Sequence, residues 1–283
     1  MNHAALGLVG LAAIFHAVWN IAAKRFTGDA AVFVWMYMTA SAVLCLPVAL
    51  LFGEWTASWA LLIGPLVTAV LHIGYSLTLQ VGYARADLNV VYPVARGTGP
   101  LITVVVAVTV LGERPGILPL LGGVIILLGI LVVTGYKRRQ NGSVSTGVLF
   151  GSATGAMIAA YTLWDHFSVV TLDLSPVTYF ALAVSIQSLL LTPKVLGKGA
   201  QLKSAFGTYR REVLLVGALS PAAYILVLVA MKSLPLSVVA PARESSIVIG
   251  SLLAWWMFHE SNPVRRLAGS AVVLTGIVLI AVN

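Results

Sequence analysis

Long apolar segments follow one another along almost the whole chain, with only short polar stretches between them. Each segment holds roughly 20 residues, enough for an α-helix to cross the hydrocarbon layer of a bilayer. No polar stretch is long enough to form a separate soluble domain. The pattern predicts an all-α integral membrane protein with ten transmembrane helices. These helices are expected over residues 4–24, 30–52, 59–84, 89–111, 117–136, 146–164, 176–193, 213–231, 236–258 and 264–282.

The composition agrees with this pattern. Hydrophobic residues make up 59% of the chain and charged residues 9%, and the mean hydropathy is +0.98. These values exclude an ordinary soluble domain. The single cysteine, Cys45, cannot form an intrachain disulfide. We interpret the net charge of +8 as a basic fringe that faces anionic lipid headgroups. Membrane lipid is therefore an expected partner, and nucleic acid is not.

The charges of the loops predict the orientation, because cytoplasmic loops carry an excess of Lys and Arg. The loops after the odd-numbered segments hold thirteen such residues, whereas those after the even-numbered segments hold only Arg114 and Lys232. We expect a multi-pass protein of the plasma (inner) membrane of a bacterium, with both termini on the outer side. The thirteen residues are Lys24, Arg25, Arg85, Lys137, Arg138, Arg139, Lys194, Lys198, Lys203, Arg210, Arg211, Arg265 and Arg266.

Two stretches of the chain repeat each other. Residues 88–113 (LNVVYPVARGTGPLITVVVAVTVLGE) align with residues 236–260 (LSVVAPARESSIVIGSLLAWWMFHE), so that Arg96 matches Arg243. The matched arginines are 147 residues apart (243 minus 96), and five predicted helices fall within that period. Because five is odd, the second copy must enter the membrane upside down. We predict two inverted-topology five-helix repeats, residues 1–140 and 141–283, around a central cavity, as is typical of secondary transporters.

Short motifs carry a resemblance to a known family. They are HAVWNIAAK at 16–24, YPVARGTGP at 92–100 and GE at 112–113, with weaker echoes in APARES at 240–245 and HE at 259–260. Over essentially its whole length the chain resembles the EamA-like branch of the drug/metabolite transporter (DMT) superfamily. The resemblance implies ten helices in two inverted halves and small metabolites as cargo, often exported. It also implies a cavity lined mainly by the first, third, fourth, sixth, eighth and ninth helices.

Two arginines inside apolar segments define the candidate site. An arginine at the bilayer centre costs at least about 2.5 kcal/mol, so Arg96 and Arg243 require compensation. Glu244 is the only carboxylate well inside a predicted segment, which leaves two positive charges facing one negative charge. Successive residues of a helix diverge by about 100°, so we expect Glu244 to reach Arg96 or a histidine rather than Arg243.

Two interpretations of the arginines remain open. The guanidiniums can bind a carboxylate, phosphate or phosphonate of the cargo as bidentate forks. Alternatively, a buried Arg–Glu salt bridge can lock the two halves together.

Further polar and aromatic residues complete the predicted substrate-binding set, because polar side chains at membrane depth normally face a bundle interior or a wet cavity. Asp165 is interpreted as a residue of the outer interface, and residues 194–211 as a basic cytoplasmic loop. Glycines at helical spacing on the fifth, sixth and tenth segments are assigned to helix packing. The predicted set is Arg96, Arg243, Glu244, Tyr92, His16, Trp19, Asn20, His72, Tyr75, Trp164 and Tyr224.

Enzyme motifs are missing. His259 and Glu260 begin HESNP, which lacks the second histidine of a zinc-binding HExxH helix, and the sequence has no GxSxG elbow and no P-loop. We therefore expect no enzymatic activity, no cofactor and no metal. An ion channel is less favoured, because nothing in the sequence indicates an oligomeric pore.

The sequence favours a secondary transporter that works by alternating access. Its expected cargo is a small polar metabolite with an acidic group: an amino acid, carboxylate, phosphate or phosphonate. Export is preferred, because one negative charge leaving the cell gains about 2.3 kcal/mol per 100 mV. The alternatives are a proton-coupled importer of the same solutes, in which Glu244, His16 or His72 titrates, and a flippase for a lipid-linked anionic sugar. We expect a monomer or a weak homodimer.

Overall fold

The computed structural model describes residues 2–55, 57–86, 88–134, 144–258 and 263–282, and in these ranges every regular element is a helix. A short π-helix, η1 (Phe167–Thr171), follows α6, and a 3₁₀ turn, η2 (Thr192–Lys194), follows α7. The α-helices are α1 (His3–Lys24), α2 (Ala30–Phe52), α3 (Trp59–Arg85), α4 (Leu88–Thr109), α5 (Ile117–Thr134), α6 (Val144–His166), α7 (Pro176–Leu191), α8 (Gly199–Met231), α9 (Leu236–Arg243), α10 (Ser246–Phe258) and α11 (Pro263–Ala281).

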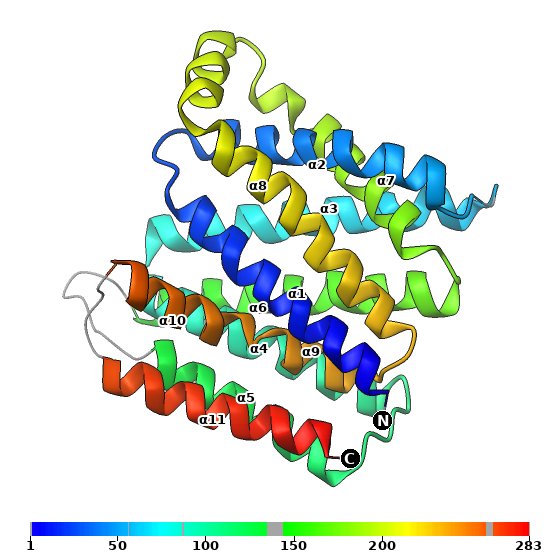
Figure 1. Ribbon diagram of the computed structural model, residues 1–283, viewed down its shortest axis with the longest axis vertical. Helices are drawn as coiled ribbons and strands as arrows, with labels where there is room; N and C mark the ends of the chain where they lie inside the picture. The colour runs from blue at the N-terminus through cyan, green and yellow to red at the C-terminus, as the bar shows by residue number, and fades with distance from the viewer. Residues whose placement is uncertain (1, 56, 87, 135–143, 259–262, 283) are drawn as a thin grey trace.

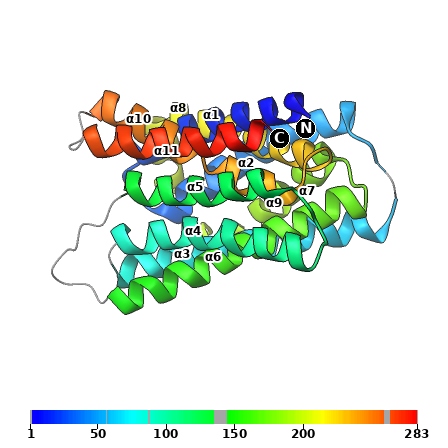
Figure 2. The same cartoon turned by 90° about the horizontal axis from the view of Figure 1, so that it is seen from below.

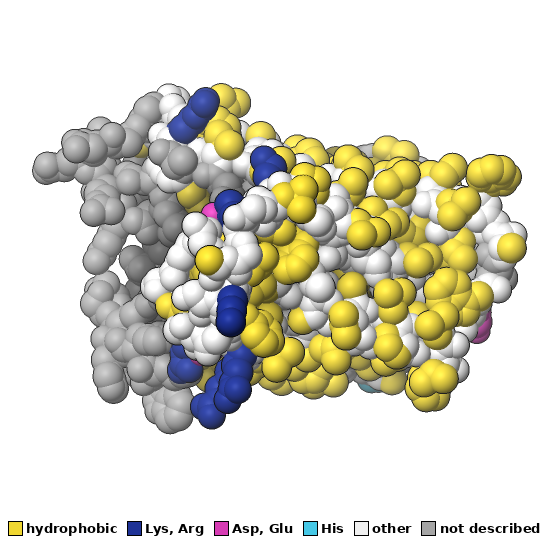
Figure 3. Space-filling view, turned by 90° about the horizontal axis from the view of Figure 1, so that it is seen from above, with side chains coloured by type: hydrophobic (Ala, Val, Ile, Leu, Met, Phe, Trp, Pro, Cys, Tyr) yellow, Lys and Arg dark blue, Asp and Glu magenta, His cyan; other side chains and the backbone are white. Residues whose placement is uncertain are grey.

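The helices lie side by side in a bundle whose two ends differ in charge. Both termini lie at the same end, which we call the terminal end (Figures 1 and 2). The connections α1–α2, α3–α4 and α7–α8 lie at the opposite end (Figure 1). Lys and Arg side chains gather at this second end, which we call the basic end, whereas the surface beyond it is mainly hydrophobic (Figure 3). The basic loop residues 137–139 lie outside the described part of the chain.

Membrane-spanning length is reached by seven of the described helical stretches, judged by length and apolar composition: α1 to α4, α6 with η1, α7 with η2, and α8. Helices α5 and α11 contain shorter apolar stretches, Ile117–Val132 and Leu267–Ile280. Much of the apolar surface faces outward: the side chains of Phe52, Ile117 and Leu149 are each more than 60% exposed. A bundle with this exterior is suited to lipid rather than to water.

Helix contacts occur in matched sets. Helix α5 packs on α11 and α2 packs on α7; α1 packs on α8 as α3 does on α6, and α1 packs on α10 as α4 does on α6. The first half of the chain can be matched to the second by pairing α1 with α6, α2 with α7, α3 with α8, α4 with α9 plus α10, and α5 with α11. Under this matching, each contact named above corresponds to another contact of the set or to itself. The alignment of the internal repeat makes the same match.

Glycines bring the backbones of α5 and α11 together, as their spacing predicts. A Cβ atom placed on Gly122 would lie 2.6 Å from the carbonyl oxygen of Gly276, and a Cβ on Gly276 would lie 2.6 Å from that of Gly122. The ridge on α6 packs in the same way on α4, because a Cβ on Gly155 would lie 2.7 Å from Cβ of Thr98. The prediction that these glycines serve packing within the bundle is confirmed.

Substituting Gly276 by alanine should therefore destabilise the bundle. Backbone cannot move aside as a flexible side chain can, so we expect a loss of about 1–3 kcal/mol, typical of overpacking. Thermal unfolding of the detergent-solubilised protein measures the effect. The matched control is Gly10→Ala on α1, where a Cβ would meet nothing within 4 Å. Equal unfolding midpoints for the two variants would contradict the close approach of α5 and α11.

Three expected elements differ from the observed ones. The segment 236–258 is broken into α9 and α10, because tight i→i+3 bonds such as Glu244 N to Pro241 O replace the α-helical pattern after Pro241. Residues 199–211, expected in a loop, begin α8, which kinks at Tyr209 (φ −116°, ψ 23°). Helix α6 does not stop at residue 164 but continues to His166 and into η1.

Candidate functional site

A cavity of about 240 Å³ lies in the middle of the bundle, among α1, α2, α3, α4, α6, α7, α8 and α9. Helices α1, α3 and α4 line it with residues from their halves nearest the basic end. Nine of the eleven predicted site residues are brought together around it. They are His16, Trp19, Asn20, His72, Tyr75, Tyr92, Arg96, Tyr224 and Arg243.

Both arginines share one buried carboxylate. Nη1 of Arg96 donates to Oε2 of Glu244 at 3.1 Å and to Oε1 at 3.4 Å. Nη2 of Arg243 lies 3.5 Å from Oε1 of the same residue. The side chain of Glu244 is only 1% exposed, so it does not line the cavity but lies behind the two arginines. The expected Arg96–Glu244 contact is thus present.

The expectation that Glu244 would miss Arg243 is wrong. It assumed a continuous helix, in which neighbouring side chains diverge by about 100°. Helix α9 ends at Arg243, and the tight turn over residues 244–245 changes these directions. The resulting contact, at 3.5 Å, is at the long limit of a hydrogen bond. Glu244 is therefore held mainly by Arg96.

The lining of the cavity offers more donors than acceptors. Of the Arg96 guanidinium, only Nη1 has a protein partner in the described part of the chain. The indole Nε1 of Trp19 is buried and has no hydrogen-bond partner there. Among the described residues, no Asp or Glu belongs to the lining. Such a surface suits a ligand that brings its own acceptor atoms, such as an anion.

Aromatic rings form much of the remaining wall. The Arg96 guanidinium lies 5.6 Å from the centre of the Tyr92 ring. The rings of His72 and Tyr161 stack with their centres 4.1 Å apart, and Tyr224 meets His72 edge-on at 5.6 Å. These contacts fix the rings in position around the cavity.

The two histidines of the set occupy different environments. The His16 ring meets Trp19 edge-on at 4.8 Å, and its backbone carbonyl accepts a bond from Nδ2 of Asn20 at 2.6 Å. Nδ1 of His72 lies 2.9 Å from the Thr68 carbonyl oxygen, which can only accept. The proton of a neutral His72 is therefore on Nδ1, and its Nε2 is left to accept.

Trp164 was expected in the set but does not line the cavity. Its indole Nε1 donates to the carbonyl oxygen of Gly64 on α3 at 2.9 Å, and its ring contacts Phe167. This hydrogen bond directs the ring toward α3, so the residue ties two helices together. Tyr161, one turn earlier on α6, lines the cavity instead.

Helices α2 and α7 also line the cavity, although the family resemblance did not imply them. The signal in the sequence is weak: of these residues, only Gln187 carries an amide side chain within an apolar segment. The residues from these two helices are Tyr37, Met38, Ser41, Phe180, Val184 and Gln187.

A second buried carboxylate corrects the count of charges. Asp165 is 0% exposed, rather than at the outer interface. Oδ1 accepts from the Tyr179 hydroxyl at 2.6 Å, and Oδ2 accepts a short hydrogen bond from the Tyr224 hydroxyl. The statement that Glu244 is the only carboxylate within a span is therefore wrong, because the apolar chain continues past Asp165 into η1.

Helix α9, which brings Arg243 to the cavity, is held in place by Glu113. All eight residues of this helix are buried. The Glu113 carboxylate accepts from the backbone N–H groups of Leu236 (2.7 Å) and Ser237 (2.9 Å) and from the Ser237 hydroxyl (2.6 Å). It thereby satisfies the free amides at the start of α9. Gly112, with φ +70°, makes the turn that presents Glu113. His259 and Glu260, the weaker echo of this motif, lie outside the described residues.

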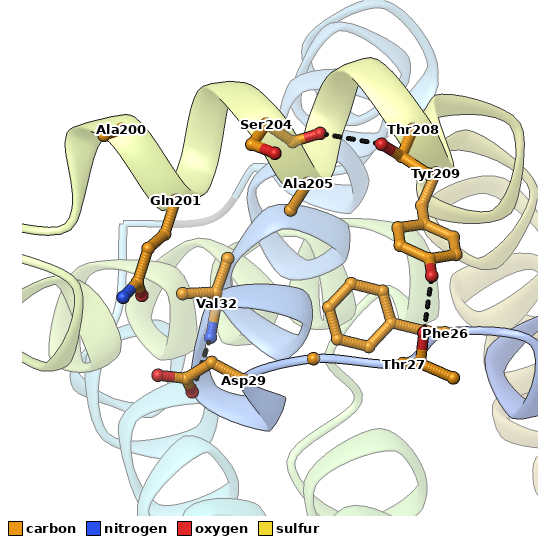
Figure 4. A pocket seen from close by; sticks show the side chains of 11 residues that line it. Phe26, Thr27, Asp29, Val32, Ala200, Gln201, Ser204, Ala205, Thr208 and Tyr209 are labelled. Atoms are coloured by element: carbon orange, nitrogen blue, oxygen red, sulfur yellow. Dashed lines mark hydrogen bonds between the residues drawn. The ribbon is translucent and has the colours of Figure 1, made fainter.

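A separate, more open pocket of about 510 Å³ lies at the basic end, between the α1–α2 connection and the start of α8 (Figure 4). The Thr27 and Tyr209 hydroxyls are hydrogen-bonded across it at 2.6 Å. Nζ of Lys198 bonds the Asp29 carboxylate at 2.5 Å, and this contact lowers the pKa of Asp29. No arginine is among the described residues that line the pocket, so we do not assign the cargo to it. Its bonds anchor the first part of α8.

Comparison with known proteins gives a consistent result. The sequence model of the EamA-like transporter family matches residues 3–135 and 145–282. A protein of known crystal structure is similar in fold, with a TM-score of 0.78 and 14% sequence identity over 98% of each chain. At that identity the likeness concerns the fold alone. No curated protein matches the chain.

Proposed function

The chain belongs to the EamA-like transporter family and is thus an integral, multi-pass membrane protein of the DMT superfamily, and from this premise we propose that it carries a small polar metabolite with an acidic group. The observation that supports this cargo is the cavity lining, which includes the guanidiniums of Arg96 and Arg243 and, among the described residues, no carboxylate. An amino acid, carboxylate, phosphate or phosphonate would supply the missing acceptors.

We further propose ten spans in two inverted five-helix halves that work by alternating access. The matched helix contacts support this arrangement, as does the entry of α1 from the terminal end and of α6 from the basic end (Figures 1 and 2). The break between α9 and α10 beside the arginines is a further support, since transporter sites are commonly built at interrupted helices. The basic end is proposed to face the cytoplasm of a bacterium, with both termini outside.

The charge that crosses the membrane decides the direction. A bare anion would be exported, because the interior-negative potential favours its exit by about 2.3 kcal/mol per 100 mV for each charge. A cargo that crosses with a proton carries no net charge, and an inward proton gradient would drive its import. One observation favours this second candidate: Asp165 is a buried carboxylate beside the cavity.

A thermal-shift screen of the purified protein against carboxylates, amino acids, phosphates and phosphonates tests the cargo. A ligand present at 100 times its Kd should stabilise the protein by about 2.7 kcal/mol. Arg243→Gln should lose this stabilisation. The matched control, Arg25→Gln, removes an exposed arginine at the basic end and should keep it. Stabilisation by cations or neutral solutes alone would contradict the proposal. Saturable uptake of the same anion into liposomes then separates a carrier from a flippase.

A further inference from the structure

Among the described residues, Asp165 is the one buried carboxylate near the cavity without a cationic partner. In the described part of the chain, no Lys or Arg nitrogen lies within 4.0 Å of it, whereas Glu244 is paired with Arg96. Both Asp165 oxygens accept from tyrosines on other helices, Tyr179 on α7 and Tyr224 on α8. An ionised carboxylate in such a place needs compensation from charges further away.

Those charges are on the other side of Tyr224. The arginines contribute two positive charges, and Glu244 and Asp165 contribute two negative ones, so these four groups together carry no net charge. An anionic cargo between the arginines adds one negative charge in a buried region where screening by solvent is weak. Of the two guanidinium charges, Glu244 neutralises one, and the other stabilises ionised Asp165. The bound anion neutralises that second charge, so the stabilisation of ionised Asp165 is lost. Uptake of one proton restores neutrality.

The geometry points to a route for this proton. The Tyr224 hydroxyl contacts Asp165, and its ring lines the cavity. When Asp165 carries the proton on Oδ2, it donates to the Tyr224 oxygen instead of accepting from it. The Tyr224 O–H is then free to donate toward the cargo. The proton comes from water that enters the cavity. Protonation would in this way create a further donor for the anion.

We propose that Asp165 is the proton site of this transporter, and that it takes up one proton when an acidic cargo binds between Arg96 and Arg243. This proposal rests on the proposed function and deepens it, because a proton that moves with the cargo favours import. Asp165 also interacts electrostatically with His72 on α3 and with Tyr161 on its own helix, and Arg243 on α9 acts on both. Tyr179 and Tyr224 are the titratable groups hydrogen-bonded to it. His72 is the competing acceptor.

Infrared spectroscopy tests the proposal without any cargo. Arg243→Gln removes one positive charge. The variant thereby imitates the bound anion, which would neutralise that charge. At pH 7 this variant should show a protonated carboxylic C=O band that the wild type lacks, and Arg243→Gln/Asp165→Asn should lose the band. The control Arg96→Gln/Glu244→Gln removes one charge of each sign and should show no band. If Arg243→Gln shows no band, or if the band persists without Asp165, the proposal is overturned.

A second arm applies if Arg243→Gln does not fold. Glu244→Gln adds one uncompensated positive charge, which favours the ionised form of Asp165. The carboxylic C=O band of Asp165 is identified as the band that Asp165→Asn lacks. On acidification, this band should therefore appear at lower pH in Glu244→Gln than in the wild type. An equal or higher pH overturns the proposal. Because neither arm uses a ligand, a failed anion screen and a failed infrared test are separate results. The first rejects the acidic cargo, and the second leaves a carrier of bare anions.

Discussion

Arg96→Ala should lower the stability of the protein by about 3 kcal/mol, because it leaves the buried Glu244 carboxylate with only the long contact to Arg243. Arg96→Ala/Glu244→Ala removes both charges and should recover most of the loss, since replacing both partners of a buried pair is often nearly neutral. Unfolding of the purified protein in detergent measures both effects. Arg25→Ala, an exposed arginine, should change stability little.

The double variant decides between the two interpretations of the arginines. If the pair only locks the halves together, a stable Arg96→Ala/Glu244→Ala protein should still bind the anion found in the screen. If Arg96 binds the cargo, the stable double variant should lose that binding. We expect the loss, because the Nη2 and Nε groups of Arg96 have no protein partner in the part of the chain that the structure describes. Retained affinity would exclude Arg96 from the binding site.

Glu113→Ala should loosen the start of α9. The carboxylate holds the first two residues of α9 through three hydrogen bonds. Loss of a helix N-cap costs about 0.5–2 kcal/mol, which converts to roughly a 2- to 30-fold higher population of open states. Val239 is 0% exposed on α9, so a Val239→Cys side chain reports opening by its rate of reaction with a polar maleimide.

This measurement requires removal of Cys45, the only native cysteine. In a Cys45→Ala/Val239→Cys background, Glu113→Ala should increase the labelling rate by the factor above. Glu54→Ala is the control, since it removes an exposed carboxylate from the connection between α2 and α3. Unchanged labelling in Glu113→Ala would show that α9 is held by packing alone.

Much of the site follows from the sequence, because an arginine in hydrocarbon is too costly to be placed without a partner. That argument identified Arg96, Arg243 and Glu244 before their geometry was known. The break at Glu244 was missed because hydropathy is continuous across it. The available signals were Pro241 and the adjacent serines Ser245 and Ser246.

Asp165 was misplaced for a related reason. A hydropathy pattern ends a span at the first charged residue, although the apolar stretch Phe167–Thr171 follows directly. Only the fold shows that tyrosines from α7 and α8 meet the carboxylate there. Pairings between residues on different helices, such as Tyr224 with Asp165, have no periodic signature in the sequence. The contribution of α2 and α7 to the cavity was missed for the same reason, because it depends on which helices pack together.

The glycine contact between α5 and α11 limits how the molecule can move. At Gly122 and Gly276 two main chains touch, with no side chain between them to change its rotamer. A sliding motion there would drive carbonyl groups into Cα atoms, whereas a small rotation about the contact would not. Helices α5 and α11 are therefore suited to act as a fixed pivot. The large displacements of a transport cycle are then expected in α9 and in the helices around the arginines.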